Sequence, residues 1–405
     1  MNTGRRKTTP RTAGKAKAAA QGAGTPRQTV LGRLPVPTWN RLHMNESAAA
    51  DLPAHWEDVD TEFTDLPAGM CERILSPEKA AAYLRKHAPS QPTEKIVAGK
   101  TPIAHEQRFA TGLGGDLEAQ LDAQGHPVHL LEVAAGTRGK EPLLWGIDQE
   151  EDGAVASRQI IHVGEDAELV VIMHCTSGAK TRGASALSTR ILLDARARMI
   201  LVRVQRLSDG LLHMDDLGVS LAEEASLKVV RMELGGGRVF TGAHAELPGR
   251  DARFEDRTGY YAGEKQELDM TVEAVHRGRG SRSDITYDGV LDGRAKKILR
   301  DTIDFRAGSR QAKGEERENV LLLSPEAENR SMPIILCEEE DMEGSHGATV
   351  GRLDEEMLFY LTTRGISAEE AARMMVRAKL QAVARHIPHH DTVEEVHARI
   401  EELLR

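Results

Sequence analysis

The sequence predicts a mainly β protein whose core is a β-helix, and three observations lead to this prediction. Short runs rich in β-branched and aliphatic residues recur from about residue 160 to about 350, at intervals of roughly 8–14 residues. Asp-Gly, a common hairpin turn, occurs in that stretch only at 209–210, 288–289 and 292–293. Aromatic residues make up 3% of the chain, which suits a core of stacked aliphatic side chains. An antiparallel sandwich also fits the strand spacing, but the scarcity of hairpin turns favours the β-helix.

The first segment, residues 1–33, is expected to be a disordered basic tail. Residues 1–45 hold nine Lys and Arg and no acidic residue, so the rest of the chain has 44 basic and 63 acidic side chains, a net charge of −19. Such an arm could contact nucleic acid or a membrane surface. Its interleaved Gly, Ala, Thr and Pro, without aromatic residues, favour a solubilising tail. We therefore expect neither nucleic acid nor membrane as a partner.

A mainly helical domain is expected over residues 34–155. The stretch 34–40 contains two prolines and the first tryptophan, and marks the entry into folded structure. Ser76-Pro77-Glu78 is typical of a helix start. Proline lacks a backbone N–H, and in the first turn of a helix that N–H would have no hydrogen-bond acceptor within the helix. A second helix is predicted over 116–123, followed by a strand over 129–133.

The β-helix core is expected over residues 156–352. Its strand-like runs are bounded by Gly, Asp or Ser, and no convincing helical period interrupts them. The clearest runs are 169–173, 190–194, 199–204, 227–231, 268–272, 284–287 and 302–305.

A helical domain is expected over residues 353–405. Asp354 can cap a short first helix, Ser367 with Glu370 forms a capping box for a second, and Thr392 with Glu395 forms one for a third. The apolar stripes of these helices fit packing on their own domain and a partner surface equally well.

Composition and missing motifs exclude several functions. The sequence contains no run of about 18 apolar residues, so no membrane span is predicted. The three cysteines (Cys71, Cys175 and Cys337) are widely spaced and form no pattern typical of disulfides, which indicates a reducing, cytoplasmic location. The glycine-rich stretches lack the Gly-Lys-Ser/Thr ending of a phosphate loop, and no hydrolase motif is present. We therefore expect a non-catalytic protein that binds no nucleotide. The histidine-rich stretch 386–390 could hold a metal, but helix-capping histidines are favoured.

One region combines residue types that bind iron or zinc. His346 lies in a Gly- and Ser-rich stretch just after the acidic run 338–341, and Cys337 directly precedes that run. Thiolate, imidazole and carboxylate are plausible ligands of these metals. On spacing alone, a buried cysteine, a turn histidine and a solvated acidic loop are favoured.

Several stretches resemble the SufB/SufD family of iron–sulfur cluster assembly proteins. The resemblance covers residues 34–405, is densest after 255, and its ordered succession of motifs is specific. The matching stretches are 34–39 (LPVPTW), 263–269 (GEKQELD), 318–327 (ENVLLLSPEA) and 343–351 (EGSHGATVG), with 358–361 (LFYL) and 364–366 (RGI) beyond them.

The resemblance implies a right-handed parallel β-helix between helical N- and C-terminal domains. It also implies that the C-terminal helices dock SufC, the ABC-type ATPase of the system, so that ATP is handled in trans. Strands near the end of the β-helix would pair with a SufB-type subunit or with a second copy of this chain. The residues expected to contact SufC are Phe359, Tyr360, Arg364, Gly365, Met375 and Leu380.

Gly347 places the resemblance on the SufD side of the family, whereas Gly344 departs from the usual SufD pattern. Gly347 stands where the SufB pattern has a glutamate after the motif histidine, and Gly344 stands where many SufD proteins have a cysteine. His346 is the one motif position carried over, as a ligand of a transient Fe–S cluster or of iron at a subunit interface. Cys337 is a hypothetical substitute for the missing thiolate.

Two alternatives remain at this point. One is a SufB-like homodimeric scaffold acting with SufC. The other is a carbohydrate-active β-helix protein, which would call for a secretion signal and aromatic sugar platforms that the sequence does not show.

Overall fold

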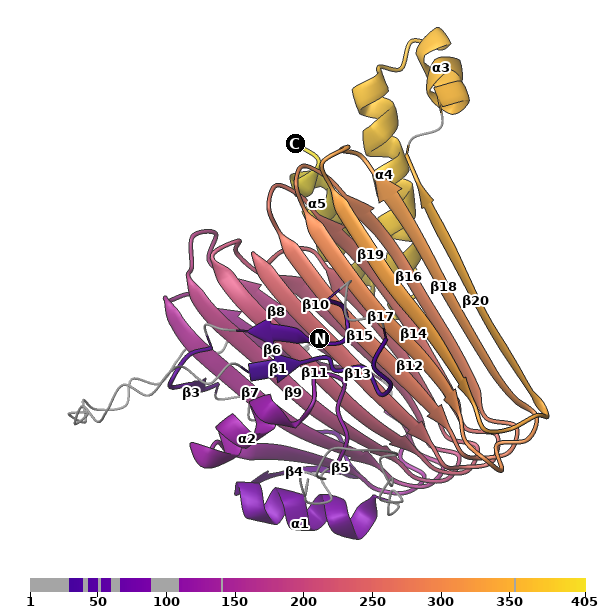
Figure 1. The fold of residues 1–405 in the computed structure, drawn as a ribbon. Helices are drawn as coiled ribbons and strands as arrows, with labels where there is room; N and C mark the ends of the chain where they lie inside the picture. Colours follow the sequence, from indigo (N-terminus) through magenta and orange to yellow (C-terminus); the bar gives the residue numbers. More distant parts are fainter. Residues whose placement is uncertain are drawn as a thin grey trace.

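The computed structural model describes residues 29–38, 43–49, 52–59, 66–88, 109–139, 141–352 and 355–405. Most of the predicted basic tail, residues 1–28, lies outside these ranges. The described chain forms a β-helix of about eight turns with helices on its flanks (Figure 1). The mainly β class and the β-helix core are therefore confirmed. Within the described ranges, no helix is long and apolar enough to cross a membrane.

Two sheets form the walls of the β-helix, and successive strands alternate between them. Eight parallel strands make the first, which we call the even sheet: β6 (Leu143–Gln149), β8 (Glu168–Ser177), β10 (Arg198–Arg206), β12 (Ser226–Glu233), β14 (Arg253–Ala262), β16 (Arg282–Leu291), β18 (Ala312–Leu322) and β20 (Met342–Gly351). Ten strands make the second, which we call the odd sheet: β3 (Glu57–Asp58), β4 (Met70–Leu75), β5 (Val128–Val133), β7 (Gly153–Val163), β9 (Gly183–Leu193), β11 (Leu211–Leu221), β13 (Arg238–Leu247), β15 (Glu267–His276), β17 (Lys296–Phe305) and β19 (Glu328–Cys337).

The core lies between the two sheets and is mainly aliphatic. Val171, Leu201 and Val229 stand in register on three neighbouring even strands and are fully buried. Because side chains alternate across a strand, every second residue points into this core. The low aromatic content therefore fits the interior that the strands enclose.

Corners with left-handed backbone replace the hairpin turns of an antiparallel fold. Asp166, Arg196 and Glu224 have φ values of 57°, 59° and 54° in successive bends from the odd sheet to the even sheet. Stacked corners bond to one another: the Arg196 N–H donates to the Glu223 carbonyl at 2.8 Å. Each bend joins strands of different sheets, so the two-residue hairpin that Asp-Gly favours is rarely needed.

The region 34–155 differs from the mainly helical domain that was expected. Its described residues hold two helices, α1 (Pro77–His87) and α2 (Gly115–Ala123), while the β-helix already begins at β5. Strand β4 extends the odd sheet antiparallel to β5, and its mixture of charged and apolar residues hides it in the sequence. The helix start at Ser76 is confirmed, because its hydroxyl accepts the Lys79 N–H at 3.4 Å.

An N-terminal hairpin lies on the outer face of the odd sheet. Strands β1 (Thr29–Leu31) and β2 (Ser47–Ala49) pair antiparallel, so residues 29–31 are not part of a disordered tail. The buried Arg300 of β17 fixes this segment: its Nε donates to the Met44 carbonyl and its Nη2 to the Ser47 hydroxyl at 2.6 Å. A buried guanidinium is stable only when a carboxylate balances its charge, and Asp269 provides that carboxylate.

Three helices follow the last strand: α3 (Glu355–Thr363), α4 (Ala368–Ala384) and α5 (His390–Leu403). Ser367 caps α4 as predicted, since its hydroxyl accepts the Glu370 N–H at 3.1 Å. The predicted Thr392 cap of α5 is wrong. The helix begins earlier, because the extended His389 accepts the Thr392 N–H on its ring nitrogen at 3.3 Å.

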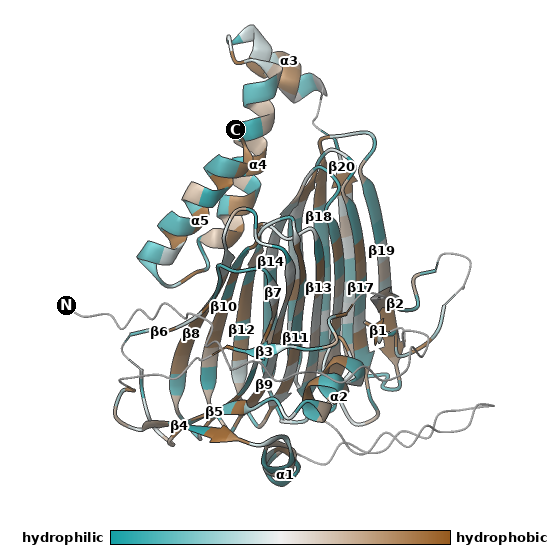
Figure 2. Ribbon diagram, turned by 90° about the vertical axis from the view of Figure 1, so that its left-hand side faces the viewer, coloured by the Kyte–Doolittle hydropathy of each residue, from teal (hydrophilic) through white to brown (hydrophobic). Residues whose placement is uncertain are grey.

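Helices α4 and α5 lie along the outer face of the even sheet, and α3 stands beyond the strands (Figures 1 and 2). Val376, Leu380 and Val383 of α4 pack with Val230 and Val290 of the sheet in one apolar cluster. The apolar stripe of α4, which the sequence assigned equally well to its own domain or to a partner, therefore packs on the chain's own β-helix.

Candidate functional site at the open end of the β-helix

The last turn of the β-helix is open. β20 is the edge of the even sheet and β19 is the edge of the odd sheet. Every residue of β20 from Glu343 to Val350 is exposed, and Val350 keeps 48% of its surface in contact with solvent. An exposed edge of this length presents a row of N–H and C=O groups that another strand can pair with.

His346 lies on the inward-facing side of this edge strand. A Cβ placed on Gly344 would meet the interior side chains of Phe305 and Ile335, so Gly344 faces inward. His346 is two residues further along and shares that side. Its register neighbour on β18 is Glu316, which is buried. The imidazole therefore closes the polar interior of the last turn while remaining accessible from the open end.

Cys337 is not brought next to His346. It is the last residue of β19, whereas His346 lies four residues into β20, about 13 Å of extended strand beyond the intervening turn. Both residues are exposed. Among the described residues, no three His, Cys, Asp or Glu side chains are placed to hold a metal ion.

The acidic run between them is used to build the turn. The Glu339 carboxylate accepts the backbone N–H groups of Asp341, Gly308 and Glu340 at 3.0–3.2 Å, which lowers the pKa of Glu339. Glu338 and Asp341 pair with Arg306 and Arg310. These carboxylates hold the last corner on the preceding one, as a structural loop rather than a ligand set.

Behind His346 lies a buried charged network that the sequence analysis missed. Lys297 is fully buried and pairs with Glu318, and its Nζ lies 3.2 Å from the Ser331 hydroxyl. Burial lowers the pKa of Lys297, and Glu318 opposes that effect. Burial and the nearby Asp301 carboxyl raise the pKa of Glu316 to about 9. The only signal in the sequence is a charged stretch, 315–318, within a strand-like run.

Helix α3 and the start of α4 form an exposed platform beyond the sheet. Phe359 and Tyr360 are 70% and 54% exposed, and Met374 and Met375 follow on α4. The Arg364 guanidinium lies 5.3 Å from the centre of the Tyr360 ring. Gly365 ends α3 with a φ of 85°, a backbone conformation that favours glycine, and thereby sets the turn into α4.

Leu380 does not belong to this platform. It is fully buried in the cluster that α4 forms with the even sheet. Five residues earlier on α4, Met375 remains 38% exposed. The expectation that Leu380 contacts a partner is therefore contradicted, because its side chain faces the strands; the exposed positions are Phe359, Tyr360, Arg364, Gly365 and Met375.

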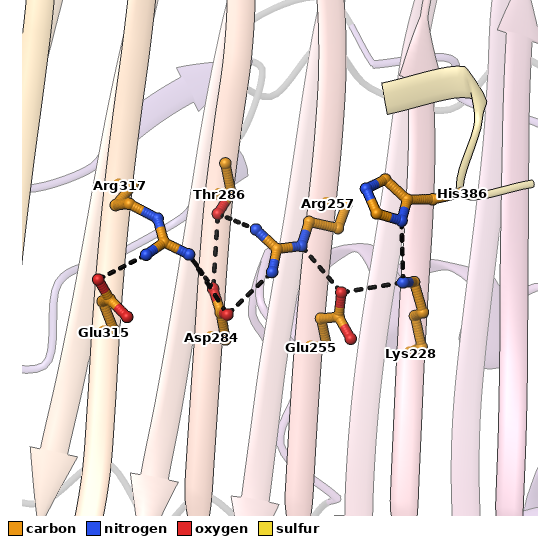
Figure 3. Close-up of polar contacts among 8 residues, drawn as sticks. All are labelled: Lys228, Glu255, Arg257, Asp284, Thr286, Glu315, Arg317 and His386. Carbon is orange, nitrogen blue, oxygen red and sulfur yellow. Dashed lines mark hydrogen bonds and ion pairs between the residues drawn. The ribbon is translucent and has the colours of Figure 1, made fainter. Parts of the chain in front are cut away.

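A ladder of alternating charges runs from His386, just after α4, across the even sheet to β18, the strand next to its edge (Figure 3). Lys228 of β12 donates to His386 at 3.2 Å, so that ring nitrogen accepts, and burial together with Lys228 lowers the pKa of His386. The ladder then passes through Glu255 and Arg257 of β14, Asp284 and Thr286 of β16, and Arg317 and Glu315 of β18. Each of its charges meets an opposite one, so the ladder aligns helix and strands and leaves no free charge for a ligand.

The fold and this end of the molecule define a class: two-sheet β-helix proteins that end in an exposed strand edge beside a helical platform. Residues 146–379, more than half of the chain, match the family model described as SUF system FeS cluster assembly, SufBD core domain. The chain belongs to this family.

Individual relatives point to the SufD side. The chain is 34% identical over 124 residues to the iron–sulfur cluster assembly protein SufD of Bacillus subtilis, a match that spans 31% of this chain and 28% of that protein. It is 25% identical over 315 residues to SufD of Escherichia coli, covering 71% and 74% of the two chains. A SufBD family protein of Mycobacterium tuberculosis is 27% identical over 292 residues, covering 70% and 72%. The chain is thus a SufD-like member of the SUF system.

Proposed function

We propose that this chain is a non-catalytic scaffold of iron–sulfur cluster assembly that joins a SufB-type subunit through its open end and an ABC-type ATPase of the SufC kind through its helical platform. The observation that carries the proposal is the exposed β20 edge, which bears His346 and leads directly into α3. The iron–sulfur cluster is the cargo of the complex, built at the subunit interface and passed on.

The absence of a phosphate loop in the sequence supports a division of labour. ATP would be bound and hydrolysed by the partner, and the motion of two ATPase subunits would be transmitted through α3 and α4. Helices α4 and α5 are anchored on the even sheet by apolar packing and by the charge ladder, so a pull on the platform would act on the strands that end at β20.

Exposed aromatic residues on a short helix are the usual anchors of such a contact. The double variant Phe359→Asp/Tyr360→Asp is expected to weaken capture of the ATPase by about tenfold or more. Both aromatic rings, and the apolar contacts that they would make with the partner, are lost in this variant. The measurement is copurification of the tagged chain with coexpressed SufC- and SufB-type subunits under ATP and reducing conditions. Ile74→Asp, at another exposed apolar residue, is the matched control and should retain the ATPase. Equal capture by the double variant, or no capture by the wild-type chain, would refute the proposed docking.

His346 is proposed as an interface ligand of the transient cluster or of its iron, and Cys337, which lies apart from His346, is proposed as a ligand at a separate point of the interface. Anaerobic reconstitution of the assembled complex should show loss of most of the bound iron and sulfide in His346→Ala, with the subunits still associated. Cys337→Ser tests the thiolate separately. If Cys337→Ser keeps the wild-type iron and sulfide content, the thiolate role is wrong; if His346→Ala keeps it, the imidazole role is wrong.

A further inference from the structure

Three successive corners of the β-helix repeat a pattern of two basic residues three positions apart. The six residues, which we call the basic strip, are all exposed: Arg250, Arg253, Arg279, Arg282, Arg310 and Lys313. Their corners stack directly, since the Asp251 N–H donates to the Arg279 carbonyl at 2.9 Å and the Gly280 N–H to the Arg310 carbonyl at 2.8 Å. The strip therefore runs along the axis of the β-helix, where even strands begin.

The middle of the strip has no neutralising carboxylates. Arg253 and Arg282 are register neighbours on β14 and β16, and Arg279 bonds to the neutral Gln311 at 2.9 Å. None of these three arginines has a carboxylate partner among the described residues. The ends of the strip differ: Arg250 pairs with Glu223 at 2.9 Å and Lys313 with Glu343 at 2.8 Å.

The fold gains nothing from this arrangement. Like charges side by side on neighbouring strands destabilise a sheet. Two residues further along the same strands, at Glu255 and Asp284, the charge ladder of Figure 3 shows the stabilising alternative of alternating signs. Three uncompensated arginines on a chain with a net charge of −10 instead create a local positive potential.

We infer that the basic strip is a docking surface for a short acidic segment of a partner polypeptide. Guanidinium groups bind carboxylates through two parallel hydrogen bonds, which lysine cannot do, and the three groups without a carboxylate partner are all arginine. Acidic corners bound the strip on both sides, at Glu223 and Glu224 and at 338–341. Two strand spacings, about 10 Å, separate the corner of Asp251 from that of Arg310, so the strip fits a segment with a few carboxylates.

Other occupants fit less well. A nucleic acid strand would extend past the acidic corners and would find no aromatic platform, since none of the six strip residues is aromatic. The acidic run of a second copy of this chain is already engaged by its own Gly308, Arg306 and Arg310.

The strip is separate from the helical platform, while its Lys313 end adjoins the edge strand β20 through Glu343. It lies where the even strands begin, whereas α3 follows the end of β20, ten residues or about 33 Å away along the strand. A partner on the middle of the strip could therefore bind while the platform is occupied, and the inference does not depend on the proposed function.

Direct binding tests it. The probe is a fluorescein-labelled octapeptide of alternating Glu and Ser, titrated with the full chain in a polarisation assay, beside a Gln–Ser octapeptide and a single-stranded oligothymidylate. Arg253→Glu/Arg282→Glu should weaken binding of the Glu–Ser peptide by about tenfold or more, and Arg253→Gln/Arg282→Gln by less. The control Arg182→Glu/Arg294→Glu makes the same charge change at exposed corners on the opposite end of the strands and should bind as the wild type does.

Saturable binding that fails only in the strip variants and weakens with salt would support the inference. Undetectable binding to the wild-type chain, equal losses in the strip and control variants, or equal binding of the Gln–Ser peptide would overturn it. Tighter binding of the oligothymidylate than of the acidic peptide would also overturn it, in favour of a nucleic-acid site.

Discussion

Proline substitutions along β20 are expected to abolish assembly with a SufB-type subunit at every second position. In a parallel sheet, consecutive residues turn their N–H and C=O groups to opposite sides, so alternate residues of β20 face β18 and the others face the open edge. Proline removes an N–H. At an edge-facing residue it destroys the ladder with the partner and leaves the pairing with β18 intact.

The measurement is a scan of single prolines over 345–349, read by size-exclusion chromatography with the coexpressed SufB-type subunit and by thermal unfolding of the isolated chain. Edge-facing positions should lose the complex with an unchanged melting temperature, whereas the intervening positions should lower the melting temperature and retain the complex. The intervening positions serve as the internal control. Assembly that survives all five substitutions would rule out pairing through β20.

Glu318→Ala is expected to lower the free energy of unfolding by about 3–5 kcal/mol. The substitution leaves the ammonium of Lys297 fully buried without its counter-ion, and the desolvation of an unpaired charge is the dominant cost. Ser331 is neutral, and the two remaining carboxyls of the network, Asp301 and Glu316, have raised pKa values and so are poor counter-ions. Chemical denaturation at constant pH gives the difference from the wild type.

The pH dependence identifies the cause. Burial already lowers the pKa of Lys297 below its ordinary 10.5, and removal of Glu318 lowers it further. The unfolded variant then holds more protons than the folded one between the two pKa values, so its stability should rise as pH increases toward 10.5. The double variant Lys297→Met/Glu318→Leu, which removes both charges of this pair, should recover most of the loss and no longer show the dependence that Lys297 causes. A deficit that is constant with pH and persists in the double variant would instead indicate a packing defect.

Local signals in the sequence predicted the elements that depend on neighbouring residues. Ser76 and Ser367 cap their helices as expected, because a cap bonds to an N–H three residues away. The strand runs also hold, since alternation is visible within a few residues. The predicted cap of α5 was wrong because two candidates, His389 and Thr392, lie within one helical turn. The extended backbone of His389 makes it the residue that precedes the helix.

The candidate site was predicted only in part. The stretch around His346 was recognised, and the structure places it on an open edge. Whether Cys337 approaches His346 depended on the length of the turn and on strand direction, which spacing could not give. Met375 and Leu380 look alike in the sequence, yet only Leu380 turns toward the even sheet.

The sequence by itself determined the β-helix class, the C-terminal helices and the family to which the motif of His346 points. The tertiary structure decided which side chains face inward. Lys296 and Lys297 are neighbours of one residue type, but the first is exposed and the second is buried against Glu318. Which side chain is buried depends on strands that are neighbours in the sheet but about thirty residues apart in the sequence, as Arg198 and Glu168 are. Local sequence patterns do not extend over that separation.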